Sequence, residues 1–182
     1  GNNDIPLLSS PTMIEDADFL VMESTYGDRL HIRNDDKAEM FLNIVYETLE
    51  KGGTVVIPSF AVGRTQEILY ELNKIKDEKH SEEFYKKYKK LMSIPVFVDS
   101  PLAISATEVF RENMDLFDDE TQAMIKSGDN PLEFPGLKFT RTAEESKELN
   151  TMNDSSIIIS ASGMCEVGRI KHHLKHHLWD PN

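Results

Sequence analysis

Small polar and charged side chains follow each of five apolar runs in this sequence. Hydroxyl groups and helix N-terminal N–H groups suit phosphate oxygens, and arginine adds the positive charge that phosphate requires. The residues of interest after the runs are, in chain order, Glu23, Ser24, Thr25 and Tyr26; Ser59, Gly63 and Arg64; Asp99 and Ser100; Thr140 and Arg141; and Ser160, Ser162, Gly163 and Arg169. Their types indicate a site for a phosphate-bearing molecule.

The apolar runs have the length and composition of short buried strands, and helical patterns separate them. We expect strands at 19–22, 54–57, 95–98, 137–139 and 157–159. We expect helices from an N-cap at 34–36 to about Lys51, then from Arg64, and at 77–90, 101–114, 119–127, 143–149 and 165–178. This alternation predicts an α/β three-layer sandwich, with a mainly parallel sheet flanked by helices. Segment 1–18 is the least regular part of the chain and is interpreted as an arm that belongs to another structural unit.

In such a sheet, ligands bind outside the carboxyl ends of the strands. Ser, Thr, Asp and Gly are also ordinary residues of β-α turns, so no single loop is specific. Their recurrence at one predicted edge favours a binding cleft. Glu23 directly follows an apolar run, where a charge is costly without a partner. It is either a functional carboxylate or one satisfied by nearby N–H groups or an arginine, and the residues alone leave both readings open.

Three other features have simpler interpretations. His172, His173, His176 and His177 form a doubled H-x-x-x-H pattern, but without a glutamate base they suit the exposed C-terminal end of a helix better than a metal site. Cys165 is interpreted as a small, at least half-buried residue rather than a reactive thiol. The lysines and tyrosines of 84–90 are interpreted as a solvated helix with an aromatic stripe, with an RNA-contacting patch as the alternative.

Composition restricts the classes of protein. The 182 residues suffice for one domain, and the longest apolar runs are far too short to cross a membrane. A single cysteine excludes an internal disulfide and predicts a cytoplasmic protein. The net charge of −12 argues against a broad nucleic-acid-binding face, although it permits a local cleft. Walker A, Gly-x-Gly-x-x-Gly and Gly-x-Ser-x-Gly signatures are absent.

Four ordered motifs resemble the β-CASP group of metallo-β-lactamase RNA nucleases, which includes the endonuclease of mRNA 3′-end processing and bacterial and archaeal RNases. Glu-Ser-Thr-Tyr-Gly-Asp at 23–28 resembles motif A of that group. The other three similar runs are 58–67, 98–103, and 160–165 followed by Gly168-Arg169. Together they cover most of the chain and are far more specific than any motif alone.

The resemblance implies a mechanism. In this group, a metallo-β-lactamase domain holds two zinc ions that activate a hydroxide for attack on a phosphodiester. The β-CASP domain covers that site and forms the RNA-binding cleft. Glu23 matches the acidic residue thought to orient a catalytic histidine. The implied substrate-binding residues are Ser24, Thr25, Tyr26, Ser59, Arg64, Ser100, Ser162, Gly163 and Arg169.

The group's His-x-His-x-Asp-His metal motif has no counterpart in this sequence. We therefore expect no metal ligand and no cofactor in this chain, two zinc ions in a full-length parent, and no cleavage by the chain alone. Residues 19–182 are expected to be the β-CASP part, excised from a longer protein. The alternatives are a self-contained α/β enzyme or binding domain for a small phosphorylated ligand, and an interaction module that forms homodimers or docks on other processing proteins.

Overall fold

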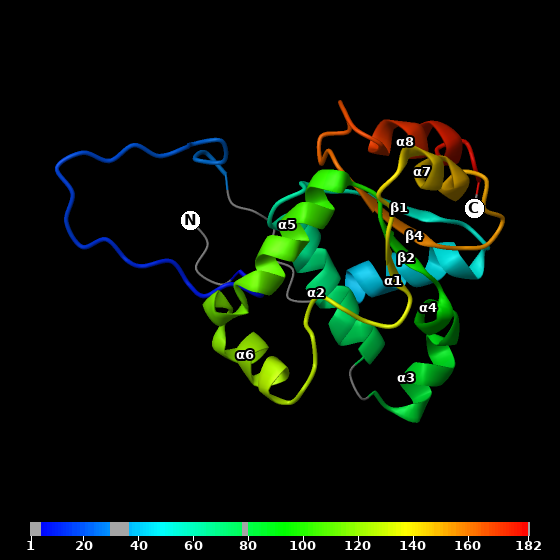
Figure 1. Cartoon of the computed structure of the whole chain (residues 1–182), viewed down its shortest axis with the longest axis horizontal. Helices are drawn as coiled ribbons and strands as arrows, with labels where there is room; N and C mark the ends of the chain where they lie inside the picture. The colour runs from blue at the N-terminus through cyan, green and yellow to red at the C-terminus, as the bar shows by residue number, and fades with distance from the viewer. Residues whose placement is uncertain (1–4, 30–36, 78–79, 182) are drawn as a thin grey trace.

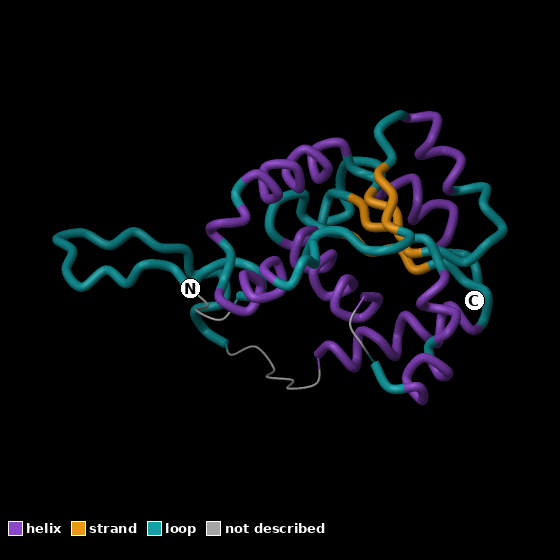
Figure 2. The backbone as a smooth tube through the Cα atoms, turned by 60° about the horizontal axis from the view of Figure 1, so that its bottom comes forward, coloured by secondary structure: helices purple, strands orange, loops and turns teal. Residues whose placement is uncertain are grey.

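The computed structural model describes residues 5–29, 37–77 and 80–181. Its described part contains one sheet of four parallel strands in the order β1-β4-β2-β3, with helices on both faces (Figures 1 and 2). The strands are β1 (Val55–Pro58), β2 (Val96–Val98), β3 (Leu137–Phe139) and β4 (Ile157–Ser160). The predicted α/β three-layer arrangement is confirmed.

The helices precede and follow the strands much as the sequence pattern predicts. They are α1 (Lys37–Glu50), α2 (Arg64–Asp77), α3 (Glu82–Lys87), α4 (Lys89–Ser93), α5 (Pro101–Glu112), the 3-10 turn η1 (Met114–Leu116), α6 (Asp119–Lys126), α7 (Ala143–Leu149) and α8 (Ile170–His177). Gly52, in the left-handed region at φ 86°, follows the end of α1. The Ser100 side chain accepts a hydrogen bond from the Ala103 N–H and so caps α5.

The central strands β2 and β4 are buried along their whole length. Alternate side chains face opposite layers because successive residues of a strand point to opposite sides. Val98 and Ile159 belong to the larger apolar core, which also includes buried residues of α1, α2 and α5. Phe97 and Ile158 pack with Leu149 of α7 in a smaller core. The central strands must therefore carry apolar side chains on both faces of the sheet.

Segment 10–29 extends away from the rest of the molecule (Figure 1). Leu7 is buried and Leu8 forms an antiparallel bridge with Phe117, so the chain is attached to the body just before this segment. The strand predicted at 19–22 is wrong: these residues lie in the extended segment, and Phe19 and Val21 are 93% and 97% exposed. In the ranges that the structure describes, no neighbouring strand supplies the hydrogen bonds that a sheet requires.

Two helix predictions also need correction. The helix expected over 77–90 is two short helices, α3 and α4, with Tyr88 between them in a non-helical conformation. The helix expected from Cys165 begins at Ile170. The N-cap predicted at 34–36 lies outside the described residues. Across the described ranges, none of the helices has the length and apolar character needed to span a membrane.

Candidate functional site

The four strands end side by side at one edge, which we call the carboxyl edge. The Ser59 N–H donates to the carbonyl oxygen of Ser160 at 3.0 Å, and the Asp99 N–H donates to that of Ile159 at 2.8 Å. On the other side of β2, the Thr140 N–H donates to the carbonyl oxygen of Val98 at 3.2 Å. The polar residues that follow the strands in the sequence are therefore brought together in space.

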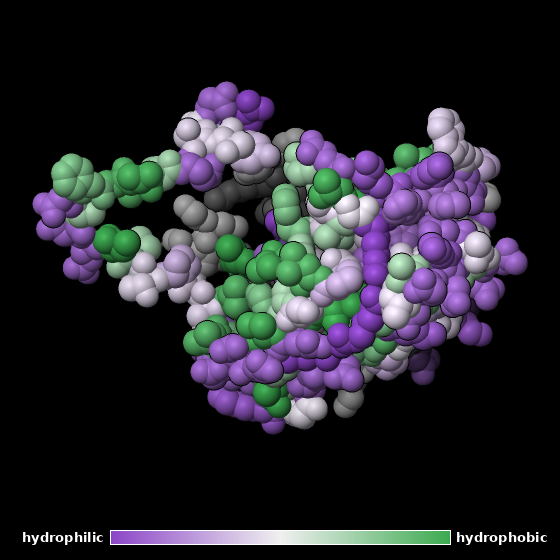
Figure 3. All heavy atoms as spheres, turned by 45° about the horizontal axis from the view of Figure 1, so that its top comes forward, coloured by the Kyte–Doolittle hydropathy of each residue, from purple (hydrophilic) through white to green (hydrophobic). Residues whose placement is uncertain are grey.

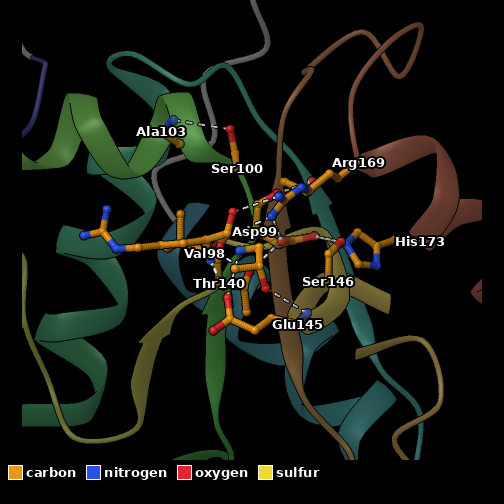
Figure 4. A network of polar contacts seen from close by, with 12 residues as sticks. Val98, Asp99, Ser100, Ala103, Thr140, Glu145, Ser146, Arg169 and His173 are labelled. Carbon is orange, nitrogen blue, oxygen red and sulfur yellow. Dashed lines mark hydrogen bonds and ion pairs between the residues drawn. The ribbon is translucent and has the colours of Figure 1, made fainter. Parts of the chain in front are cut away.

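Asp99 is the centre of a buried polar network at this edge (Figure 4). Its Oδ1 atom accepts hydrogen bonds from Arg169 (Nη1, 2.7 Å) and from the Thr140 hydroxyl. Its Oδ2 atom accepts from the Ser146 hydroxyl and lies 2.6 Å from His173 Nε2. Burial raises the pKa of Asp99, but hydrogen bonds from these four side chains outweigh burial and lower it to about 2. The carboxylate is therefore ionised at neutral pH.

His173 is fully buried between two acceptors. The side-chain amide of Asn150 donates from Nδ2 to the carbonyl oxygen of Ser146 at 3.3 Å, which turns its Oδ1 atom toward His173 Nδ1 at 2.9 Å. The other ring nitrogen faces the Asp99 carboxylate. Each ring nitrogen therefore lies within hydrogen-bond distance of a side-chain oxygen. The pair joins the end of β2 to α8.

Arg169 has most of its hydrogen-bonding capacity occupied within the protein. Its Nη1 atom bonds Asp99 and the Thr140 carbonyl oxygen, and its Nη2 atom donates to the Arg141 carbonyl oxygen at 2.9 Å. Its side chain is 21% exposed. Arg64, at the start of α2, is far more accessible, and among the described residues its one ion pair is with Glu67 at 2.6 Å. An exposed pair of this kind is weak, so Arg64 remains able to meet an anion.

The loop 161–168 packs tightly over the end of β4. A Cβ atom on Gly163 would lie 3.1 Å from the Phe60 ring, and one on Gly168 would lie 2.3 Å from the Ala161 carbonyl oxygen. The Ser162 hydroxyl is buried, and no described group hydrogen-bonds it. Cys165 lies in this loop at φ 60°, half-buried, and not at a helix start. Because Gly163 and Gly168 lack side chains, the loop can approach Phe60 and Ala161 more closely than other residues would allow.

The predicted site residues separate into two groups. Six of them, Ser59, Arg64, Ser100, Ser162, Gly163 and Arg169, lie at or beside the carboxyl edge. The other four, Glu23, Ser24, Thr25 and Tyr26, lie in the extended segment 10–29, outside that edge. Glu23 is exposed and accepts a hydrogen bond from the Thr25 N–H at 2.8 Å, and this bond lowers the pKa of Glu23. Among the described residues, the partners of Glu23 are thus the backbone and side chain of Thr25.

Sequence reasoning missed the role of His173. The four histidines were expected at an exposed helix end, yet His173 is buried, whereas His172 is exposed. Buried Ile170, three residues earlier on α8, marks the inner face on which His173 lies, and this spacing was the available signal. Among the described residues, no group of three or more His, Cys, Asp or Glu side chains could hold a metal ion.

Exposed apolar side chains surround the carboxyl edge. They come from the loop after β1, the first turn of α5 and the loop after β4, and they are 56 to 67% exposed. This apolar rim consists of Phe60, Val62, Leu102, Met164 and Val167. Figure 3 shows apolar side chains gathered on the face beside the extended segment, whereas the far right of that view is mostly polar.

Residues 65–182 match the Beta-Casp domain. The chain belongs to the Beta-Casp family. The domain match covers α2 to α8, and so includes Asp99, His173 and the loop 161–168. The motif resemblance seen in the sequence is thereby confirmed for the family, although not for the role of any single residue.

This Beta-Casp chain has ribonucleases among its relatives. It is 38% identical over 181 residues to "Ribonuclease TTHA0252" of Thermus thermophilus, covering 100% of this chain and 39% of that protein. It is 34% identical to an "RNase J-like protein" of Methanocaldococcus jannaschii, covering 93% of this chain and 36% of the relative. It is 30% identical to "Endoribonuclease ysh1" of Schizosaccharomyces pombe, with 83% and 18% covered. The chain thus spans well under half the length of these relatives.

Proposed function

We propose that this chain is the RNA-binding, cleft-forming part of a zinc-dependent ribonuclease of the metallo-β-lactamase fold, and that it is inert in cleavage by itself. The observation that carries the proposal is the carboxyl edge, where polar strand ends adjoin the exposed apolar rim. The ribonuclease names of the relatives support the reaction class.

The rim suits contact with a further domain. Contiguous exposed apolar side chains on a soluble protein usually mark an interface. The segment 19–22 has the same character, with all four apolar side chains more than 70% exposed. Both features fit a chain whose partner, the metallo-β-lactamase part of the same protein, covers the carboxyl edge and pairs with the extended segment.

The polar part of the edge suits an RNA strand. Arg64 is exposed there, and Asp99 holds Arg169 and the loop that follows β4 in one arrangement. Loop 161–168 offers backbone close to the surface because Gly163 and Gly168 carry no side chains. In this proposal, Asp99 and His173 are positioning residues, which fix the edge without contacting RNA.

The described residues do not fit a zinc centre, since no suitable group of ligands lies among them. The two zinc ions belong to the parent protein in this proposal, and no step is assigned to them here. Glu23 is proposed to orient a catalytic group of the parent once the extended segment has docked. Its exposed carboxylate is free of any salt bridge among the described residues, so it can take such a partner.

Hydrolysis of a labelled single-stranded RNA tests the proposal. The 182-residue chain is compared with the same chain restored to its flanking metallo-β-lactamase segments, each with and without zinc. We expect cleavage only by the restored protein, and a chelator should stop it. Turnover by the short chain, or zinc-independent turnover by the restored protein, would overturn the proposal. Turnover of a small phosphorylated ligand without RNA cleavage would instead support the self-contained enzyme.

A further inference from the structure

Gln66 is a fully buried polar side chain on α2, two residues after Arg64. Its Oε1 atom accepts a hydrogen bond from the Gly63 N–H at 2.7 Å. Because the Gly63 carbonyl oxygen accepts the first bond of α2 from the Glu67 N–H, Gly63 is the N-cap and Gln66 the third residue of the helix. A glutamine at this position commonly caps a helix in this way, so this bond alone implies no further role.

The other end of the same amide is not explained by capping. The Gln66 Nε2 atom donates to the Ala61 carbonyl oxygen at 3.2 Å, in the loop after β1, and to the Thr107 hydroxyl oxygen at 2.9 Å, on α5. The Thr107 hydroxyl donates its own hydrogen to the Ala103 carbonyl oxygen at 2.8 Å, so its oxygen can accept from Gln66. Gln66 therefore joins the loop after β1 to α5.

The two elements that Gln66 joins carry different parts of the carboxyl edge. The loop after β1 carries Phe60 and Val62 and leads into Arg64, whereas α5 carries Leu102 in its first turn. Loops are usually the more mobile parts of a fold. A buried amide is costly to leave unpaired, so Gln66 disfavours any arrangement in which this loop moves away from α5.

We propose that Gln66 is a positioning residue, which fixes the place of Arg64 at the carboxyl edge by holding the preceding loop against α5. The inference rests on the proposed function, because Arg64 is an exposed cation assigned there to RNA. Gln66 is fully buried and so acts without touching RNA. The exposed pair of Arg64 with Glu67 is weak, so the position of Arg64 depends mainly on the backbone that Gln66 holds at Gly63.

A capping role and a positioning role require different chemistry at residue 66. A glutamate would accept the Gly63 N–H equally well, but a carboxylate cannot donate to Ala61 and Thr107. Gln66→Glu therefore keeps the cap and removes the link to α5. Thr107→Val is the milder variant, because it keeps the shape of the side chain and removes only the hydroxyl at the α5 end of the link. Thr107→Ser retains that hydroxyl.

The test measures kcat/KM for zinc-dependent cleavage of single-stranded RNA by the restored protein. Gln66→Glu and Thr107→Val should each lower kcat/KM roughly tenfold, as expected when a charge-assisted contact to a phosphate is weakened. Thr107→Ser should keep the kcat/KM of the unmodified protein. Arg64→Gln should cause a loss similar to that of Thr107→Val, and the two changes together should cause no further loss, because both act through one contact.

Asn73→Leu is the matched control for a general loss of stability. Asn73 is a second fully buried amide on α2, and it donates to the carbonyl oxygens of Asn130 and Glu133 at 2.9 and 2.8 Å, away from the carboxyl edge. This variant should keep the kcat/KM of the unmodified protein.

Amide hydrogen exchange of the same proteins tests the link without relying on cleavage. Thr107→Val should speed exchange at residues 59–64 and leave residues 130–133 unchanged, and Asn73→Leu should do the reverse. Unchanged exchange at 59–64 in Thr107→Val would overturn the inference.

The kinetic results separate this inference from the proposed function. Equal kcat/KM for Thr107→Val and Thr107→Ser, or losses that multiply when Thr107→Val is combined with Arg64→Gln, would overturn the role of Gln66. The proposed function would then stand, because the unmodified restored protein still cuts RNA. Absence of cleavage by the unmodified restored protein would overturn the proposed function and, with it, the role of Gln66 toward RNA.

Discussion

The Asp99 carboxylate and the His173 ring, separated by 74 residues in the chain, lie 2.6 Å apart with both side chains fully buried. This pair joins the end of β2 to α8. Arg169 and Ser146 complete the set of donors around the same carboxylate. The arrangement of the carboxyl edge therefore depends on this buried polar network.

His173→Ala should destabilise the protein strongly. Removal of the ring leaves a buried cavity and takes one hydrogen-bond donor away from the buried Asp99 carboxylate, which together cost about 2–4 kcal/mol. Urea denaturation measures the loss in the free energy of unfolding. His172→Ala is the matched control, because its side chain is exposed, and it should change stability by less than ~0.5 kcal/mol. Equal stability of the two variants would show that the network contributes nothing.

Lys76 should make stability rise with pH in alkaline solution. It is buried, donates to the Ile94 carbonyl oxygen at 2.6 Å, and its burial lowers its pKa from 10.5 to about 8. Between these values the unfolded chain binds the proton and the native protein does not. The free energy of unfolding therefore increases as pH rises from about 8 to about 10.5, by up to ~3 kcal/mol.

Denaturation of Lys76→Met across this pH range provides the measurement. The variant should lack the Lys76 contribution to the rise, whereas Lys126→Met, at an exposed position, should keep it. Parallel pH profiles for Lys76→Met and the unmodified protein would contradict the prediction.

Gly168→Ala should disturb the carboxyl edge far more than Gly52→Ala. Both glycines have positive φ values, 85° and 86°, so an added Cβ atom strains either backbone. At Gly168 that atom would also lie 2.3 Å from the Ala161 carbonyl oxygen, whereas at Gly52 nothing lies within 4 Å. Thermal unfolding should show a cost of about 1–2 kcal/mol for Gly52→Ala and a distinctly larger one for Gly168→Ala. Similar costs would mean that loop 161–168 relaxes freely.

Glu23→Gln should remove RNA cleavage by the restored protein without changing its thermal unfolding midpoint. The exposed side chain contributes little to packing, and glutamine keeps an oxygen to accept the Thr25 N–H. The proposed role needs the negative charge, which glutamine lacks. Single-turnover cleavage assays and thermal unfolding are run on the same samples. Ordinary turnover by this variant would exclude the role proposed for Glu23.

The sequence alone determined the fold class and the family of this protein. Runs such as 95–98 and 157–159 are apolar because a parallel sheet that is covered on both faces buries both sides of its strands. Such runs identify strands well, and four of the five predicted strands are present. Local signals also placed helix boundaries, as at Gly52 and Ser100, since caps depend on the chemistry of a few adjacent residues.

Only the tertiary structure decided which of these residues meet. Segment 19–22 has a strand's composition, but no strand among the described residues lies beside it, because pairing depends on distant chain segments rather than on its own residues. Likewise, His173 and His172 are adjacent and identical in type, yet α8 turns one into the network of Asp99 and leaves the other exposed. Which of the histidines is buried depends on how α8 is oriented against the rest of the protein. The pattern of four histidines does not determine that orientation.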